Sequence, residues 1–265
     1  MYIDFHFHAF ADKIAKRAVA QLESVAEYLH AETDGTVADT LKKMDKWGID
    51  KAVLLPIATK PTQEHVVNDW AASVKSERFY AFGSVHPDSQ DALDELERIK
   101  SLGLNGVKFH PDYQEFFIDE PKMLPLYRKC AELCLPVIFH AGFDPLSPDV
   151  VHALPEASAR VFDAVPDMTM ILAHLGGMYH WDEVEKYLVG RKGNLFLDTA
   201  FVGDRIADEQ LERIIRNHGA ERILFASDCP WDDPRQEINA IERLALSDEE
   251  KECIFFKNAE RILNA

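Results

Sequence analysis

Short apolar runs alternate with amphipathic stretches along the whole of this 265-residue chain. Several of the apolar runs are continuous, as expected for parallel strands that are covered on both faces. The stretches between them repeat their apolar residues with helical periodicity. The pattern predicts eight strands, at Tyr2–Phe7, Lys51–Pro56, Phe79–Val85, Gly106–His110, Pro136–His140, Met170–Ala173, Leu195–Asp198 and Ile223–Ala226.

Capping residues predict where some of the intervening helices begin and end. Thr36 can cap a helix that stops at Gly48, just before the second strand. Gly103 can end the helix that follows the third strand. Ser247 and Glu250 have the spacing of a capping box at the start of the last helix.

Eight strand–helix alternations predict the α/β class and a single (β/α)8 TIM barrel over residues 1–265. A doubly wound open sheet is the alternative, and it needs fewer strands. No linker, low-complexity segment or internal repeat indicates a second domain. The segment from Ala9 to Thr36 is the longest connection after a strand. We expect it to be helical and to lean over the barrel mouth.

Composition narrows the classes of partner. The net charge of −17 argues against a nucleic-acid binder, which needs a positive face. The longest apolar stretch, Ala52 to Ala58, is too short to cross a membrane, and no basic region precedes a hydrophobic run as in a signal peptide. The four cysteines form no metal-ligand framework, and Cys130 and Cys134 are expected to be buried on one helix face. A reduced, cytoplasmic protein is the expectation.

Histidine and aspartate gather at the predicted strand ends, where functional side chains of a barrel stand. His6 and His8 lie two residues apart on the first strand, so both imidazoles point the same way. Two neutral imidazoles make half of a tetrahedral site for a borderline metal such as zinc. The other strand ends carry His86, Lys108, His110, His140, His174, Asp198 and Asp228.

Four motifs resemble the metal-site motifs of the amidohydrolase superfamily. They are His6-Phe-His8, Pro-Val-Ile-Phe-His140-Ala-Gly, Ile-Leu-Ala-His174-Leu-Gly-Gly and Leu-Phe-Ala-Ser-Asp228-Cys-Pro-Trp. The chain is most similar to the amidohydrolase-related branch, which contains metal-dependent hydrolases, lactonases and nonoxidative decarboxylases. The closing segment around Asn258 is similar to that branch as well. The resemblance extends over nearly the whole chain but identifies no substrate.

The resemblance implies that His6, His8, His140 and Asp228 ligate one divalent ion, with zinc as the expected metal. Three imidazoles and a carboxylate leave room for water or substrate, as in a catalytic site. His174 would then polarise or protonate the substrate, or join as a fifth ligand. Asp228 would both ligate the metal and carry a proton. Asp198 could bind a substrate hydroxyl, orient a ligand histidine or simply end its strand.

Lys108 leaves three roles open. In binuclear members of the superfamily a lysine on the fourth strand is carboxylated and bridges two metals, so a second ion is expected only with that modification. A plain ammonium would bind a substrate carboxylate or form a structural ion pair. We expect Lys108, His110, Tyr113 and Trp231 to contact a small-molecule substrate, and a homodimer stays open.

Two chemistries fit the same residues. The first expectation is a hydrolase in which metal-activated water attacks a lactone, ester or amide, with Asp228 and His174 as catalytic groups. The alternative is a nonoxidative carboxy-lyase acting on an unsaturated or aromatic acid. Two features favour the hydrolase: the short chain, and His140-Ala-Gly in place of the His-Pro-Trp of aminocarboxymuconate semialdehyde decarboxylases. An inactive metal-dependent binding protein and a Schiff-base aldolase using Lys108 are the remaining readings.

Overall fold

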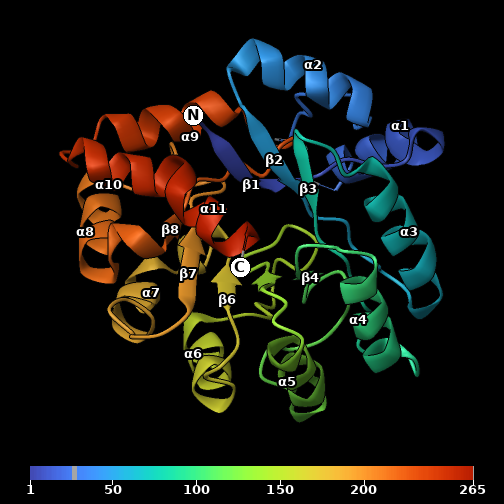
Figure 1. Cartoon of the computed structure of the whole chain (residues 1–265). Helices are drawn as coiled ribbons and strands as arrows, with labels where there is room; N and C mark the ends of the chain where they lie inside the picture. The colour runs from blue at the N-terminus through green and yellow to red at the C-terminus, as the bar shows by residue number, and fades with distance from the viewer. Residues whose placement is uncertain (26–28, 265) are drawn as a thin grey trace.

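The computed structural model describes residues 1–25 and 29–264. Parallel strands stand at its centre and helices surround them, as Figure 1 shows. The strands are β1 (Ile3–Phe7), β2 (Lys51–Leu54), β3 (Phe79–Ala81), β4 (Val107–Phe109), β5 (Val137–Phe139), β6 (Met170–Leu172), β7 (Leu195–Asp198) and β8 (Ile223–Leu224). They pair in chain order, β1 to β3 and β4 to β8.

Backbone contacts join the two runs of strands into a closed barrel. Between β3 and β4, Gly83 bridges to Val107, and the Lys108 amide donates to the Gly83 carbonyl at 2.8 Å. Between β8 and β1, the Phe5 amide donates to the Phe225 carbonyl at 2.9 Å. The predicted (β/α)8 barrel is therefore confirmed, and the open sheet is wrong.

The helices form the outer ring of the barrel (Figure 1). They are α1 (Asp12–Glu23), α2 (Val37–Trp47), α3 (Glu64–Val74), α4 (Ala92–Ser101), α5 (Leu124–Glu132), α6 (Pro155–Ala164), α7 (Trp181–Tyr187), α8 (Asp208–His218), α9 (Pro234–Glu242), α10 (Asp248–Glu252) and α11 (Asn258–Leu263). Short 3-10 turns lie at Pro61–Gln63, Pro121–Met123, His174–Gly176 and Ala220–Arg222, and Cys253–Lys257 is a π-helical turn.

The predicted caps are present. The Thr36 side chain accepts from the Asp39 amide, and Gly48 ends α2 in the left-handed conformation at φ 76°. Ser247 and Glu250 form the reciprocal capping box. The prediction for Cys134 is wrong: it follows the end of α5 and is exposed, whereas Cys130 is buried.

The first strand contains an irregularity that matters for the site. Asp4 pairs with Ala52, but Phe7 instead of His6 pairs with Leu54, so β1 carries one extra residue. Phe5 consequently lies in the cluster inside the barrel, whereas Phe7 lies in the cluster between strands and helices. The buried Asp4 carboxylate accepts from the amide of His6 at 3.1 Å and that of Ser227 at 3.0 Å, which bridges β1 and β8 at this point.

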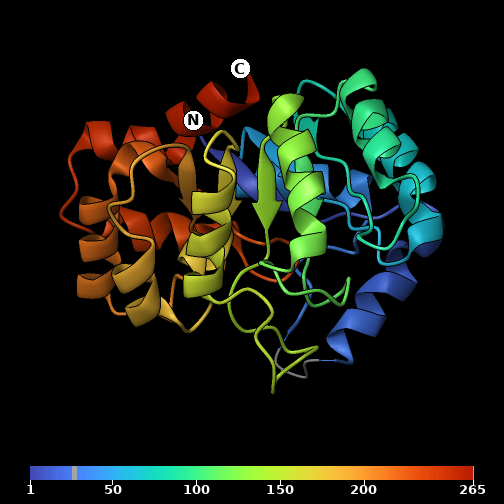
Figure 2. The ribbon, with the colours of Figure 1, turned by 90° about the horizontal axis from the view of Figure 1, so that it is seen from below.

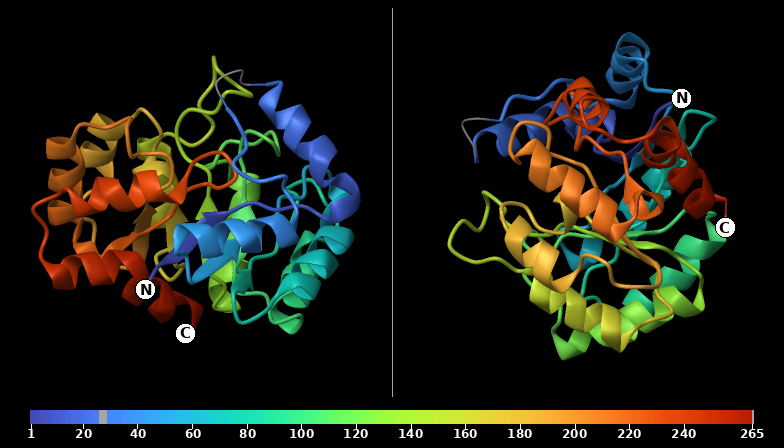
Figure 3. Two further views of the ribbon diagram at one scale, coloured as in Figure 1. Left: turned by 90° about the horizontal axis from the view of Figure 1, so that it is seen from above. Right: turned by 90° about the vertical axis from the view of Figure 1, so that its left-hand side faces the viewer.

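The barrel interior is apolar at one end and polar at the other. The inner cluster joins side chains from the strands to Ala259, Ile262 and Leu263 of α11. Figure 2 shows both chain termini and α11 at one end, with the longest loops at the opposite end, and Figure 3 shows the same division from two further sides. Most of the strand-end residues predicted for the site, such as His140 and His174, lie in the first loop positions because the strands are shorter than predicted.

The connection after β1 lies at the end of the barrel that carries the long loops. It contains α1 (Figure 2), and the Glu32 amide donates to the Pro230 carbonyl in the loop after β8 at 2.8 Å. The predicted helical segment over the mouth is thus present, although residues 26–28 of it lie outside the described part. Within that described part, every helix is too short or too polar to cross a bilayer.

Candidate metal centre

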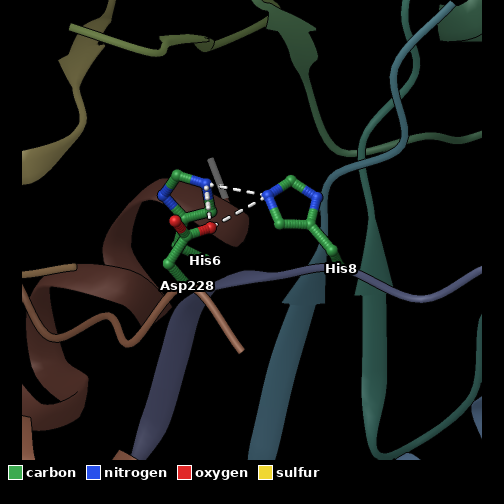
Figure 4. A group of neighbouring side chains, drawn as sticks. All are labelled: His6, His8 and Asp228. Atoms are coloured by element: carbon green, nitrogen blue, oxygen red, sulfur yellow. Dashed lines mark hydrogen bonds and ion pairs between the residues drawn. The ribbon is translucent and has the colours of Figure 1, made fainter. Parts of the chain in front are cut away.

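His6, His8 and Asp228 bring three ligand atoms to one point (Figure 4). The Nε2 atoms of the two histidines are 3.2 Å apart. Asp228 Oδ1 lies 3.3 Å from His6 Nε2 and 3.0 Å from His8 Nε2. His6 is fully buried, while the side chains of His8 and Asp228 are 12% and 15% exposed, so the group opens toward the mouth.

The second ring nitrogen of each histidine determines which nitrogen carries the proton. His6 Nδ1 faces Asp198 Oδ2 at 2.9 Å, and His8 Nδ1 faces the Leu55 carbonyl at 2.9 Å. Both partners can only accept, so Nδ1 is the protonated nitrogen in each ring. Burial, followed by the charge of Lys108, lowers the pKa of His6 well below its usual range, so this imidazole is neutral. Both Nε2 atoms therefore present bare lone pairs toward Asp228.

This arrangement fits a divalent metal. Ligand atoms at about 2.0–2.1 Å from a common ion in tetrahedral geometry stand about 3.4 Å apart, close to the 3.0–3.3 Å observed here. Without a cation, two lone pairs and a carboxylate oxygen would face one another in a largely buried space. The prediction that His6, His8 and Asp228 act together is thus supported by their geometry.

Asp198 holds this centre from behind. Its Oδ2 accepts from His6, and its Oδ1 accepts from the backbone amides of His174 at 2.9 Å and Ala200 at 3.0 Å. Burial raises the pKa of the Asp198 carboxyl to about 7, against the lowering effect of those two amides. Of the three roles open for Asp198, the structure supports orientation of a ligand histidine.

Asp198→Asn is expected to weaken metal binding by about 10–100-fold, the usual cost of losing such an outer partner. The asparagine oxygen can still accept from the His174 and Ala200 amides, so the fold is kept. Its amide group, however, would donate toward His6 Nδ1 and move the proton to Nε2, the ligand atom. Titration of the metal-free variant by calorimetry measures the change, and an unaltered affinity would contradict the orienting role.

His174 and His140 are linked to each other. His174 Nδ1 faces the Ala200 carbonyl at 3.0 Å, so it carries the proton, and its Nε2 lies 3.0 Å from His140 Nδ1. Burial lowers the pKa of His174 to about 4, which keeps it neutral and makes Nε2 an acceptor. Both nitrogens of His174 are engaged, so direct contact with a substrate requires the bond to His140 to open.

His140 does not lie in the group of His6, His8 and Asp228. Its Nε2 points instead toward Asp144, at 3.7 Å, and it groups with His110 and Asp144. The imidazoles of His110 and His140 stack at 4.3 Å between ring centroids, and Tyr113 stacks on the other side of His110 at 3.9 Å. Its predicted role as a ligand of the first metal would need another orientation of the ring.

Lys108 is buried inside the barrel beside the first group. Its Nζ lies 3.2 Å from His6 Nε2, and burial lowers its pKa to about 8. Over the described residues, no ion pair of 4.0 Å or less is formed by Lys108. The structural ion pair is therefore not supported, and contact with a substrate anion or a carbamate stay as predictions.

Trp231 follows Asp228 in the loop after β8, and its amide donates to the Asp228 carbonyl at 2.9 Å. Its half-buried ring packs against the main core, which places it beside the centre but not in it. His174 and Asp228 adopt left-handed backbone conformations, with φ of 57° and 68°. Strained backbone of this kind concentrates at functional sites.

Three carboxylates near the strand ends were missed in the sequence. Asp4 sits between β1 and β8, and Asp112 and Asp144 lie in the loops after β4 and β5. Asp112 and Asp144 follow the site histidines by two and four residues, and that spacing was the available signal. Asp4 precedes His6 by two residues, but the extra residue in β1 could not be read from the pattern.

Comparison with known proteins gives a consistent result. A sequence model of the amidohydrolase family matches residues 3–265. A gamma-resorcylate decarboxylase from a Polaromonas species is 25% identical over 232 residues, covering 70% of this chain and 70% of that protein. An uncharacterised TIM-barrel protein from Bordetella bronchiseptica superimposes with a TM-score of 0.79 at 18% identity, over 99% of this chain and 98% of that one.

A second solved structure is relevant to the metal. Dihydroxybenzoic acid decarboxylase from Polaromonas, with bound manganese and the inhibitor 2-nitroresorcinol, superimposes with a TM-score of 0.70 at 18% identity. The superposition covers 99% of this chain and 96% of that one. At this identity the likeness shows the barrel fold.

Proposed function

Because the chain belongs to the amidohydrolase family over residues 3–265, we propose that it is a metal-dependent, nonoxidative decarboxylase of an aromatic or unsaturated acid. The observation that carries the proposal is the group of His6, His8 and Asp228, whose ligand atoms converge within 3.3 Å. The likeness to the Polaromonas decarboxylase, at 25% identity, favours carboxy-lyase chemistry over the hydrolase expected first.

The two features that favoured a hydrolase carry less weight beside the structure. The superposition on dihydroxybenzoic acid decarboxylase covers 96% of that chain, so chain length does not separate the two chemistries. The residues that follow His140 concern a histidine whose Nε2 faces Asp144, away from the first group. Hydrolysis of a lactone, ester or amide stays a prediction.

His6, His8 and Asp228 would hold the divalent ion. When bound, the ion supplies positive charge that orients the substrate's carboxylate or an adjacent oxygen and stabilises negative charge on it. Zinc remains a prediction for its identity, since imidazole and carboxylate donors accept both zinc and the manganese seen in the Polaromonas structure.

Residues of this chain would bind and orient the acid. Lys108 offers a buried positive charge 3.2 Å from His6 Nε2, where it can pair with a substrate anion. Asp228 is more exposed than the histidine His6 behind it, so it can carry the proton that replaces the departing carboxyl group. His174, held by Ala200 and His140, would position the wall of the site.

The test is an assay for carbon dioxide. Protein loaded with manganese or zinc is incubated with 2,6-dihydroxybenzoate and related hydroxybenzoates, and in parallel with a panel of lactones, esters and amides. We expect carbon dioxide and the decarboxylated arene in equal amounts, with no activity after chelation. Hydrolysis without carbon dioxide release would overturn the decarboxylase and restore the hydrolase.

A further inference from the structure

Four buried side chains at the mouth form a second polar group that the proposed reaction does not use. They come from the two loops that follow β4 and β5 and are His110, Asp112, His140 and Asp144. Each is at most 7% exposed. Asp144 Oδ2 lies 3.6 Å from His110 Nε2 and 3.7 Å from His140 Nε2, and Asp112 Oδ2 lies 3.8 Å from His140 Nε2.

These separations are too long for hydrogen bonds but suit ligands of a shared ion. A hydrogen bond to a ring nitrogen is expected at about 2.7–3.2 Å. Two ligand atoms at about 2.2 Å from one cation in tetrahedral geometry are about 3.6 Å apart, which matches the contacts of Asp144 Oδ2 with both imidazoles. The ligand atoms of His110, His140 and Asp144 all lie within 4.8 Å of one another.

The hydrogen bonds around His140 determine what its Nε2 can do. His174 Nε2 is an acceptor, because its Nδ1 donates to the Ala200 carbonyl, so His140 Nδ1 carries the proton in the 3.0 Å contact between the two rings. A neutral His140 then directs a bare lone pair at the carboxylates of Asp112 and Asp144. Among the described residues this Nε2 has no hydrogen-bond partner.

The two carboxylates are oriented in the same manner. Asp112 Oδ1 accepts from Ser147 and from His152 Nδ1, and Asp144 Oδ1 accepts from the Leu146 amide at 2.7 Å. Each Oδ1 is thus used within the loops, and each Oδ2 is left facing the imidazoles. Asp112 Oδ2 is buried without a hydrogen-bond partner in the described part of the chain.

Charge balance requires a cation among these atoms. Two carboxylates are buried side by side, and no lysine or arginine in the described ranges forms an ion pair with either of them. Burial, then the charge of Asp112, raises the pKa of Asp144 to about 7, so the carboxylate is unfavourable without a positive partner. His110 can turn its lone pair to the same point, since the 3.5 Å contact of its Nδ1 with the Tyr113 amide is too long to determine its tautomer.

We propose that His110, His140 and Asp144, with Asp112 beside them, form a second site for a divalent transition-metal ion. The site is separate from the group of His6, His8 and Asp228 and needs no carbamate on Lys108. A ligand set of two imidazoles and two carboxylates suits zinc or manganese. The ion would tie the loop after β4 to the loop after β5 at the barrel mouth.

Metal stoichiometry tests the proposal independently of activity. The purified full chain is loaded with zinc or manganese, dialysed against metal-free buffer and measured by elemental analysis. We expect about two ions per chain in the unaltered protein and about one in each of Asp144→Asn, His110→Gln and His8→Ala. The double variant His8→Ala, Asp144→Asn should hold none.

Asp149→Asn is the matched control, because Asp149 is an exposed carboxylate in the same loop as Asp144. It should keep both ions. A single ion that is lost in both His8→Ala and Asp144→Asn would overturn the proposal, since the residues would then serve one shared metal. Two ions retained in Asp144→Asn and His110→Gln, or one ion unaffected by them, would overturn it as well.

Circular dichroism and thermal unfolding of each variant separate loss of a ligand from loss of the fold. The outcome is also separable from the proposed reaction. A decarboxylase with one ion per chain leaves that function intact and removes the second site, whereas two ions without carbon dioxide release do the reverse.

Discussion

Asp228→Asn is expected to abolish metal binding at the group of His6, His8 and Asp228 and to lower kcat/KM for decarboxylation by about 10³-fold. The carboxylate is the one anionic donor among the three ligand atoms, and its Oδ1 lies within 3.3 Å of both Nε2 atoms. Asparagine keeps the size but removes the charge that offsets the cation. The same change removes the group proposed to carry the proton. Elemental analysis and steady-state carbon dioxide release measure the two losses separately.

Asp233→Asn provides the control for this prediction. Asp233 lies in the same loop after β8 and caps α9 by accepting from the Arg235 amide. Asparagine caps a helix about as well as aspartate, so this variant loses a charge near the site without losing structure. We expect its metal content and kcat/KM to stay within about twofold of the unaltered protein. Equal losses in the two variants would show that general loop charge, and not ligation, is responsible.

Gly142→Ala is expected to lower the free energy of unfolding by about 2–5 kcal/mol. Gly142 has a φ of 88°, and a Cβ placed on it would lie 2.0 Å from the Met178 amide nitrogen and 2.6 Å from its carbonyl oxygen. These are backbone atoms that cannot turn aside, because Gly142 and Met178 form a bridge between the loops after β5 and β6. The change should push apart the loops that carry His140 and His174. Denaturant unfolding measures the loss.

Gly48→Ala separates the two causes of that loss. Gly48 also has a positive φ, 76°, but a Cβ there would meet nothing within 4 Å. We expect this variant to lose only about 1 kcal/mol, the cost of the left-handed backbone alone. If both substitutions cost the same, the close approach of Gly142 to Met178 contributes nothing to stability.

The sequence by itself determined the fold and half of the site. Eight apolar runs with helical stretches between them can be buried on both faces only by a closed or doubly covered parallel sheet. Local signals that act within a few residues, such as the cap at Thr36 and the pair Ser247 and Glu250, were likewise readable. The two-residue spacing of His6 and His8 correctly predicted that their imidazoles meet.

Tertiary structure decided how the remaining site residues are grouped. Strand-end positions place His110, His140 and His174 at one mouth but say nothing of where each ring nitrogen points. Those directions depend on partners far along the chain, such as Asp198 for His6 and Ala200 for His174. Whether Asp112 and Asp144 converge on His140 depends in turn on how two loops pack. Periodicity records which face a residue occupies, whereas ligand geometry is set by hydrogen bonds between distant strands, and only the folded barrel contains them.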